Sequence, residues 1–245
     1  MKKLVTAFAA CMLAGLVSAQ VESQNIVGYV STVNLAANYF TMVAPPFSAV
    51  GGTAIPVASL FSDNSSFIAS DTEGGADTLK VWNGTGYDTY FFSSDADNKW
   101  ASGDDSFSET TATLPAGSAF WFFRRGAALT GMTVAGQVLT TNVTVAVAGN
   151  YFTMVGNPFA APLPIKSLTA PGLIASDTEG GADTLKVWNG TGYDTYFYSS
   201  DADNKWASGD DSFSETTATL PAGSAFWFFR RGVATSLTLP VPFVL

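Results

Sequence analysis

An internal duplication constrains the fold of this chain more than any other feature of its sequence. Residues 68–126 recur as residues 174–232 with one substitution, Phe92 to Tyr198, so 58 of 59 positions are identical at an offset of 106. A second match, residues 38–43 against 150–155, has an offset of 112, so the second copy is six residues shorter between the two matches. A segment so long and so little changed is expected to fold in the same way twice.

The length of the repeated unit, about 110 residues, is that of a self-sufficient β-sandwich and exceeds the 20 to 50 residues of a solenoid repeat. We therefore expect two tandem domains, residues 20–133 and 134–245. The alternative is one pseudo-two-fold domain whose halves exchange strands, because near-identical tandem copies permit domain swapping.

Runs of β-branched and aromatic residues between turn residues predict that the fold is all-β, with two tandem β-sandwich or barrel-like domains. The strands expected in the first copy are residues 26–35, 39–44, 78–82, 87–93, 117–123 and 129–134. The sequence Asn83-Gly84-Thr85-Gly86 predicts a hairpin turn between the third and fourth of these strands. Pro56 and Pro164 are each expected to begin a short helical turn.

One predicted strand is apolar on both faces. Residues 119–123 read Ala-Phe-Trp-Phe-Phe, with no alternation between apolar and polar positions. Both faces must therefore be covered. We expect one to meet the domain core and the other to be buried by a loop, by the sister domain or by a partner.

The first nineteen residues have the three parts of a secretory signal. Lys2 and Lys3 precede an apolar run at residues 4–17, and Val17-Ser18-Ala19 is a small-residue cleavage site. We therefore expect a signal peptide at residues 1–19 and a protein that is secreted, periplasmic or on the cell surface. A lipoprotein signal that ends at Cys11 is the alternative.

Composition excludes several kinds of chemistry. The chain has no histidine, and its one cysteine lies in the expected signal, which argues against Ser-His or Cys-His catalysis, thiolate or histidine zinc sites, and disulfides. Without Lys2 and Lys3 the chain keeps nine basic and twenty acidic residues, a formal charge of −11 that disfavours nucleic acid as a partner. No apolar run after residue 19 approaches the length of a membrane-spanning helix, so no transmembrane segment is expected.

Aromatic side chains near polar ones are the first candidates for a binding site, because the apolar faces of sugar rings stack on them. Trp82 is expected to share a strand face with Lys80, and Trp100 is flanked by an acidic loop. Burial in the domain core is the alternative for each, and the expected position of Trp121. The ligand-binding candidates are Trp82, Tyr87, Tyr90, Trp100, Trp188, Tyr193, Tyr196 and Trp206.

Two acidic loops are the second candidate, because clustered carboxylates suit calcium. The candidate ligands are Asp95, Asp97, Asp104, Asp105, Asp201, Asp203, Asp210 and Asp211. The loops fail the EF-hand template, since Lys99 and Trp100 occupy its fifth and sixth positions. Solvated turns at strand ends are the other interpretation, and we expect these loops on the surface. Apart from calcium, no cofactor is expected.

Each copy also resembles small β-sandwich modules of uncharacterised secreted bacterial proteins. The residues that carry the resemblance are Gly156-Asn157-Pro158-Phe159, Trp188-Asn189-Gly190 with Tyr193 and Tyr196, and Pro221-Ala222-Gly223-Ser224-Ala225-Phe226. The first copy departs from it with Ala44-Pro45-Pro46-Phe47. The resemblance implies a β-sandwich in an exported protein and brings no activity with it.

Together these features predict a secreted or surface-associated binding or structural protein that is not an enzyme, with a glycan or another cell-surface component as its partner. A carboxylate-dependent glycoside hydrolase and an outer-membrane β-barrel are the alternatives. Tandem near-identical copies favour multivalent binding over catalysis. Arg124 and Arg125 are expected to neutralise nearby carboxylates rather than to bind an anion.

The one variable position of the long repeat gives a further expectation. A buried phenol hydroxyl without a partner is costly, so Phe92 and Tyr198 are both expected to reach water or a polar group. By strand alternation they share a face with Tyr90 and Tyr196, which is then expected to be the wetter face.

Overall fold

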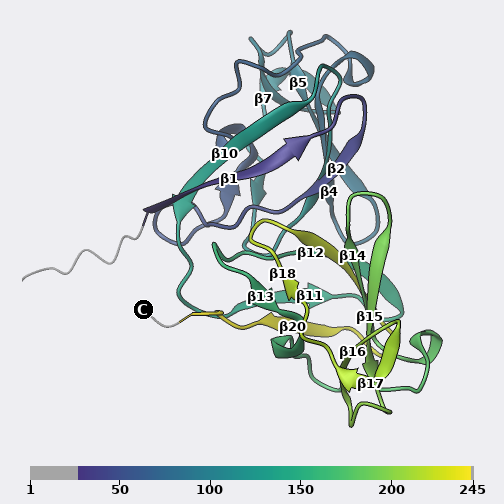
Figure 1. Ribbon diagram of the computed structural model, residues 1–245. Coiled ribbons are helices and arrows are strands. Elements are labelled where there is room, and N and C mark those ends of the chain that lie inside the picture. Colours follow the sequence, from purple (N-terminus) through teal and green to yellow (C-terminus); the bar gives the residue numbers. More distant parts are fainter. Residues whose placement is uncertain (1–26, 244–245) are drawn as a thin grey trace, which may run out of the picture.

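A computed structural model describes residues 27–243, which fold as an all-β protein with two similar domains in tandem (Figure 1). The expected signal peptide at residues 1–19 and the expected start of the first domain at residue 20 lie outside the described residues. Between residues 27 and 243 no helix is long and apolar enough to cross a membrane.

Each copy is built on a six-stranded antiparallel sheet. In the first copy its order is β2 (Phe40–Val43), β9 (Phe120–Phe123), β4 (Thr78–Trp82), β5 (Tyr87–Ser93), β6 (Lys99–Ser102) and β7 (Asp105–Glu109). In the second copy it is β12 (Tyr151–Gly156), β19 (Ala225–Arg230), β14 (Thr184–Trp188), β15 (Tyr193–Ser199), β16 (Lys205–Ser208) and β17 (Asp211–Glu215). Both sheets are open, because their first and last strands do not pair, so each domain is sandwich-like.

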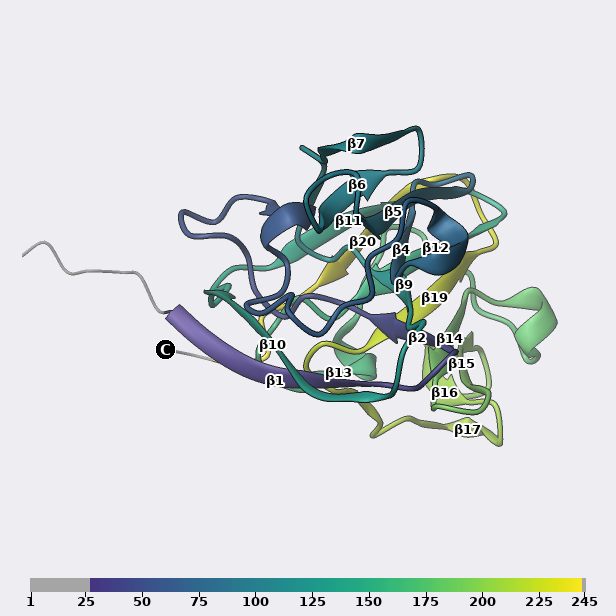
Figure 2. The same ribbon diagram turned by 90° about the horizontal axis from the view of Figure 1, so that it is seen from above.

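Two-stranded ribbons complete each domain. In the first copy β1 (Val27–Leu35) pairs with β10 (Leu129–Gln137), and β3 (Ile55–Pro56) pairs with β8 (Thr113–Leu114). In the second copy β11 (Val143–Val147) pairs with β20 (Thr235–Leu239), and β13 (Leu163–Pro164) pairs with β18 (Thr219–Leu220). Figures 1 and 2 both show β1 and β10 side by side as a curved ribbon.

The described strands pair only within their own copy, so residues 27–243 show no exchange of strands between the halves. The expected boundary between residues 133 and 134 needs correction, because it falls inside β10. Pairing of β10 with β1 continues to Gln137, and β11 begins at Val143. Residues 138–142 therefore link the two domains.

Most of the predicted strands are present, and the hairpin turn after Trp82 is formed as expected. The Asn83 side-chain oxygen accepts from the backbone N–H groups of Thr85 and Gly86, at 3.1 and 2.8 Å. Short 3₁₀ helices, η2 (Val57–Ser59) and η4 (Ile165–Ser167), follow Pro56 and Pro164. Two more, η3 (Glu73–Gly75) and η5 (Glu179–Gly181), precede β4 and β14. Strands β6 and β7, which lie within or beside the acidic loop, were not predicted.

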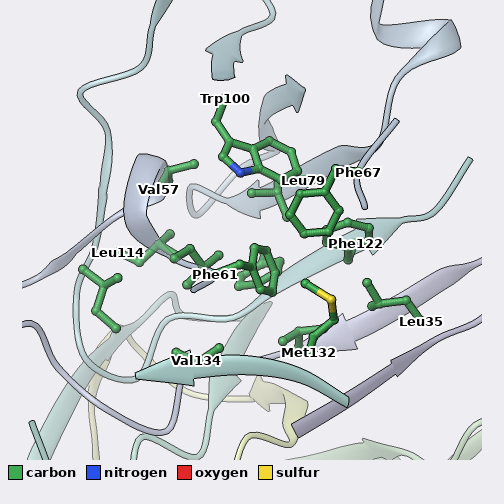
Figure 3. Packing of buried hydrophobic residues seen from close by; sticks show 14 of the residues in the cluster. Leu35, Val57, Phe61, Phe67, Leu79, Trp100, Leu114, Phe122, Met132 and Val134 are labelled. Carbon is green, nitrogen blue, oxygen red and sulfur yellow. The ribbon is translucent and has the colours of Figure 1, made fainter. Parts of the chain in front are cut away.

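The core of the first copy lies between its six-stranded sheet, the β1–β10 ribbon and the segment after η2 (Figure 3). Phe120 and Phe122 of β9 point into it, as do Leu79 of β4 and Val134 of β10. The second core repeats this arrangement around Phe226 and Phe228. Burial of such large side chains stabilises each domain without a disulfide among the described residues.

A buried ion pair fixes the end of β9 in each copy. The Arg124 guanidinium contacts the Asp77 carboxylate, which also accepts from the backbone N–H groups of Arg125 at 2.6 Å and Ile68 at 2.9 Å. The Arg230–Asp183 pair is equivalent, with both side chains almost fully buried. As expected, the first arginine of each doublet neutralises a carboxylate. The second packs on a ring, with the Arg125 guanidinium 4.3 Å from the centre of Phe123.

Candidate functional site

The face of each six-stranded sheet that points away from its own core is aromatic. Strand alternation places Lys80 and Trp82 of β4 on this face, and Leu79 and Val81 on the core face, as expected. Cross-strand partners extend the aromatic face, because Trp82 lies opposite Tyr87 of β5 and Lys80 lies opposite Trp121 of β9. The equivalent pairs in the second copy are Trp188 with Tyr193, and Lys186 with Trp227.

The two aromatic faces meet each other, so the sister domain supplies the second cover that residues 119–123 require. Small and flexible apolar side chains form the centre of this interface: Met42, Ala44, Ala119, Met154 and Ala225. Two backbone hydrogen bonds cross it, from Ala44 N–H to Gly223 O at 3.0 Å and from Gly156 N–H to Gly117 O at 2.8 Å. These bonds join equivalent positions in opposite directions, which gives the interface an approximate two-fold relation.

Beside this centre the sheets leave two open aromatic clefts. The first has a volume of about 430 Å³ and is lined by Tyr39, Phe40, Lys80, Tyr87, Trp121, Trp188 and Tyr193. The second has a volume of about 400 Å³ and is lined by Trp82, Tyr151, Phe152, Lys186, Tyr193 and Trp227. Each cleft takes residues from both copies, and their linings are largely equivalent under the offsets of the duplication.

Tryptophans of the two copies contact each other across the interface. Trp82 packs edge-on against Trp227 with ring centres 5.4 Å apart, and Trp121 packs edge-on against Trp188 at 6.1 Å. Tyr151 stacks on Trp82 at 5.9 Å. These contacts hold the walls of the clefts in fixed positions, whereas the rings of Tyr39, Phe40, Tyr87, Tyr151 and Tyr193 are exposed.

Polar groups lie at the edges of the aromatic surface. Lys80 binds Glu73 at 2.9 Å, and Lys186 binds Glu179 at 2.7 Å, so the charge of each lysine is compensated. Burial raises the pKa of the Tyr87 hydroxyl, while the Trp121 indole N–H that donates to this oxygen at 3.3 Å acts in the opposite direction. The hydroxyl therefore stays protonated at neutral pH and can donate a hydrogen bond.

A polar groove of about 540 Å³ continues from Tyr193 in the second copy. Its lining includes Glu179, Asp194, Thr195, Ser208 and Asp210. Asp194 accepts from the Asn189 amide at 2.8 Å, and Glu179 forms its ion pair with Lys186. The groove therefore offers hydrogen-bonding groups next to an exposed aromatic ring.

A hollow larger than either cleft lies elsewhere on the interface. It measures about 690 Å³ and is lined by the turn after Trp82, residues 113–119 and β11. Most of its lining residues are small and apolar, and Asp88 is its only charged lining residue in the described chain. Two of the aromatic candidates, Trp82 and Tyr90, also line it, but both are half-buried, so it lacks the exposed aromatic rings of the two clefts.

The structure divides the eight aromatic candidates into three groups. Trp82, Tyr87, Trp188 and Tyr193 come together at the clefts. Trp100 and Trp206 must be withdrawn, because they are 1% and 2% exposed and lie in the two cores. Each turns inward because the unpredicted strands β6 and β16 place it opposite Phe92 or Tyr198.

Tyr90 and Tyr196 lie on the wrong face for the clefts. Both pack at the rims of the domain cores, together with Phe92 and Tyr198. The expectation that theirs is the wetter face was therefore wrong, because the face with Tyr87 and Trp82 carries the clefts. Phe92 is also buried, at 4% exposed, whereas Tyr198 is half-buried.

The acidic loops are on the surface, as expected, with all eight candidate aspartates exposed. Asp97, Asn98, Asp203 and Asn204 adopt positive φ angles near 56°, which is typical of a tight turn. No group of three or more acidic side chains between residues 27 and 243 could hold a metal ion. The solvated-turn interpretation therefore accounts for these loops better than a calcium site.

Several cleft residues were missed by sequence reasoning. Trp121 was expected in the core, but Phe120 and Phe122 occupy the core positions and Trp121 points to the sister domain. Tyr39 and Phe40, with their equivalents Tyr151 and Phe152, were read only as parts of a strand. The sequence did carry a signal for them, because residues 38–43 recur exactly as residues 150–155, outside the long repeat.

These features define a class: an all-β protein of two sandwich-like tandem domains whose facing sheets enclose paired aromatic clefts. Comparison of the chain with protein-family models, with curated proteins and with solved structures finds no match in any of the three. Its function must therefore be argued from the clefts themselves.

Proposed function

We propose that this is a secreted or cell-surface, non-catalytic protein that binds uncharged glycans in the clefts between its two copies. One observation carries the proposal: equivalent residues of the two copies form two open clefts whose exposed rings lie beside hydrogen-bonding side chains. A sugar ring needs both, because its C–H faces are apolar and its edge carries hydroxyl groups.

The charge of the clefts supports an uncharged ligand. Lys80 and Lys186 are their only charged lining residues in the described chain, and a glutamate neutralises each. The full chain has a formal charge of −9, which disfavours anionic polysaccharides.

A glycoside hydrolase is the second candidate, because the polar groove brings Glu179, Asp194 and Asp210 to one place. Glycoside hydrolysis requires one carboxyl group that donates a proton and another that stays ionised. Here two of the three carboxylates already have partners, because Lys186 binds Glu179 and the Asn189 amide donates to Asp194. Binding of sugar hydroxyl groups is the role that this arrangement supports better.

A glycan array, probed with and without a calcium chelator, tests the proposal. We expect neutral glycans to be bound equally well under both conditions. A Trp121→Ala, Trp227→Ala double variant should lose the signal, whereas Phe107→Ala, which removes an aromatic ring that is 74% exposed and lines neither cleft, should keep it. Binding that requires calcium, or that survives in the double variant, would contradict the proposal, and release of free sugar would favour the hydrolase.

A further inference from the structure

We propose that the two clefts form one continuous track that takes a single linear chain of β-(1→4)-linked neutral hexoses across the junction between the copies. The inference rests on the proposed function and adds to it the type of glycan chain and the number of chains bound per protein. It predicts one polymer segment for each protein chain, rather than one sugar for each cleft.

The clefts are contiguous. Tyr193 lines both of them, so the two clefts border each other at this one side chain. Tyr87 of the first cleft packs against Trp82 of the second, with ring centres 5.2 Å apart.

Aromatic contacts continue without a break from one sheet to the other. The row begins with Phe40 against Trp121 at 6.2 Å and passes through the Trp121 hydrogen bond to Tyr87. From Tyr87 it reaches Trp82 and then Trp227 at 5.4 Å. It ends with Trp227 against Phe152 at 6.2 Å, on the second sheet. Six aromatic side chains from two domains thus form a single row of contacts, with Lys80 and Lys186 beside it.

The two-fold relation of the clefts favours a flat, ribbon-like chain. A sugar polymer has a direction, and the two clefts meet it in opposite directions because equivalent residues are exchanged across the interface. Ring stacking depends on the face of a sugar and not on the direction of the chain, so it tolerates this reversal. A β-(1→4)-linked hexose chain presents such apolar faces along its length, and successive units turn them to opposite sides.

The polar groove gives the track hydrogen-bonding groups beyond the rings. Tyr193 lines the groove as well as both clefts. A chain that crosses the junction over this ring would pass beside Thr195, Ser208 and Asp210, whose oxygens can bind its hydroxyl groups.

Isothermal titration with β-(1→4)-linked glucose oligomers of two, four and six units tests the inference. We expect affinity to rise with length, by about a hundredfold from the shortest to the longest, which is the low end of the gain from linking two sites. The six-unit oligomer should bind with one molecule per protein chain. Tyr39→Ala in the first cleft and Tyr151→Ala in the second should each weaken its binding by roughly threefold to tenfold.

Matched controls separate this inference from the proposed function. Phe107→Ala should bind as the unchanged protein does, because Phe107 lies on edge strand β7 and lines neither cleft. Two six-unit oligomers per chain, or an affinity that is independent of length, would overturn the single track and leave glycan binding in place. Failure of all three oligomers would overturn the track, while the glycan array decides on sugar binding itself. Self-association that Tyr39→Ala abolishes would show instead that a second copy occupies the clefts.

Discussion

Two of the differences between the copies have a physical cause in the structure, and the first lies at a corner of the domain core. Where Phe92 stands in the first copy, Phe67 packs over it at 5.7 Å and over Trp100 at 5.4 Å, so Phe92 is only 4% exposed. In the second copy Leu173 stands at the position of Phe67, and the segment from Leu168 to Ile174 is two residues shorter than the segment from Leu60 to Ile68. Tyr198 is half-buried there. The loop that covers the corner thus decides whether a hydroxyl group is tolerated there.

The second difference lies at the interface between the copies. Ala44 and Gly156 are equivalent residues, and they meet across the approximate two-fold relation. A Cβ atom on Gly156 would lie 2.3 Å from the Ala44 Cβ and 2.7 Å from the Ser118 carbonyl oxygen. Only one of the two positions can carry a side chain, so a perfectly symmetrical pair of alanines is excluded. At these two places the residue differs between the copies because its neighbours differ: a covering loop at position 92 or 198, and the other copy at position 44 or 156.

The largest effect is expected where the copies are identical. Asp77→Ala leaves Arg124 buried without its carboxylate, and Asp183→Ala does the same to Arg230. Each substitution should lower the free energy of unfolding by about 3–5 kcal/mol. Urea denaturation measures both, and Glu73→Ala, which breaks an exposed pair, should cost less than about 1 kcal/mol. Clearly unequal losses of unfolding free energy at Asp77 and Asp183 would show that the two buried ion pairs are not equivalent.

The next effect tests the interface. Gly156→Ala should cost about 3 kcal/mol, because its new methyl group meets both a side chain and a backbone oxygen. Exchanging the residues in an Ala44→Gly, Gly156→Ala double variant should restore part of the stability, since it removes the contact with the Ala44 methyl group and keeps the one with the Ser118 carbonyl oxygen. Thermal unfolding of the three variants checks this. A double variant that is as unstable as Gly156→Ala alone would show that the Ser118 carbonyl oxygen, and not Ala44, sets the cost.

The third effect concerns the corner under Phe67. Phe92→Tyr should lower the free energy of unfolding by about 1 kcal/mol, because the new hydroxyl group enters a buried aromatic corner. Tyr198→Phe should change it by less than about 0.5 kcal/mol, because the half-buried hydroxyl group loses little. Adding Phe67→Leu to Phe92→Tyr should recover part of the loss, and equal costs at positions 92 and 198 would refute the role of the loop.

The smallest effect separates the two core tryptophans. The Trp206 indole N–H donates to Leu168 O at 3.0 Å, whereas that of Trp100 is buried with no acceptor in the described chain. Replacement by phenylalanine removes a similar volume from each core, but only Trp206→Phe removes a hydrogen bond. Trp206→Phe should therefore be more destabilising than Trp100→Phe by about 1 kcal/mol in urea titrations. The reverse order would show that Trp100 has a partner that the structure does not reveal.

The sequence predicted the duplication, the all-β class, the hairpin after Trp82 and the face of β4, because each of these depends on local patterns. It did not predict β6, because the acidic residues around Lys99 and Trp100 resemble a loop and the pairing partner is β5. The inward position of Trp100 follows from that pairing and could not be read from its neighbours.

The site shows the same limit more clearly. Because residues 119–123 are apolar on both faces, the sequence indicated that the second face is also buried. It did not say whether a loop, the sister domain or a partner covers that face. Which residues line the clefts depends on how two separately folded sheets meet, and local periodicity carries no information about this contact. Their aromatic character beside polar residues identified Trp82 and Tyr87 as candidates, but their juxtaposition with Trp227 and Tyr193 required the structure.

Acrylamide quenching of tryptophan fluorescence tests most directly whether the aromatic clefts bind glycans. Of the six tryptophans, Trp100 and Trp206 are in the cores, and the other four line the clefts. Fluorescence should therefore divide into an accessible and a protected fraction, and a saturating six-unit β-(1→4)-glucose oligomer should shrink the accessible fraction. An accessible fraction that is unchanged by an oligomer shown to bind would place the binding site outside the clefts and contradict the account.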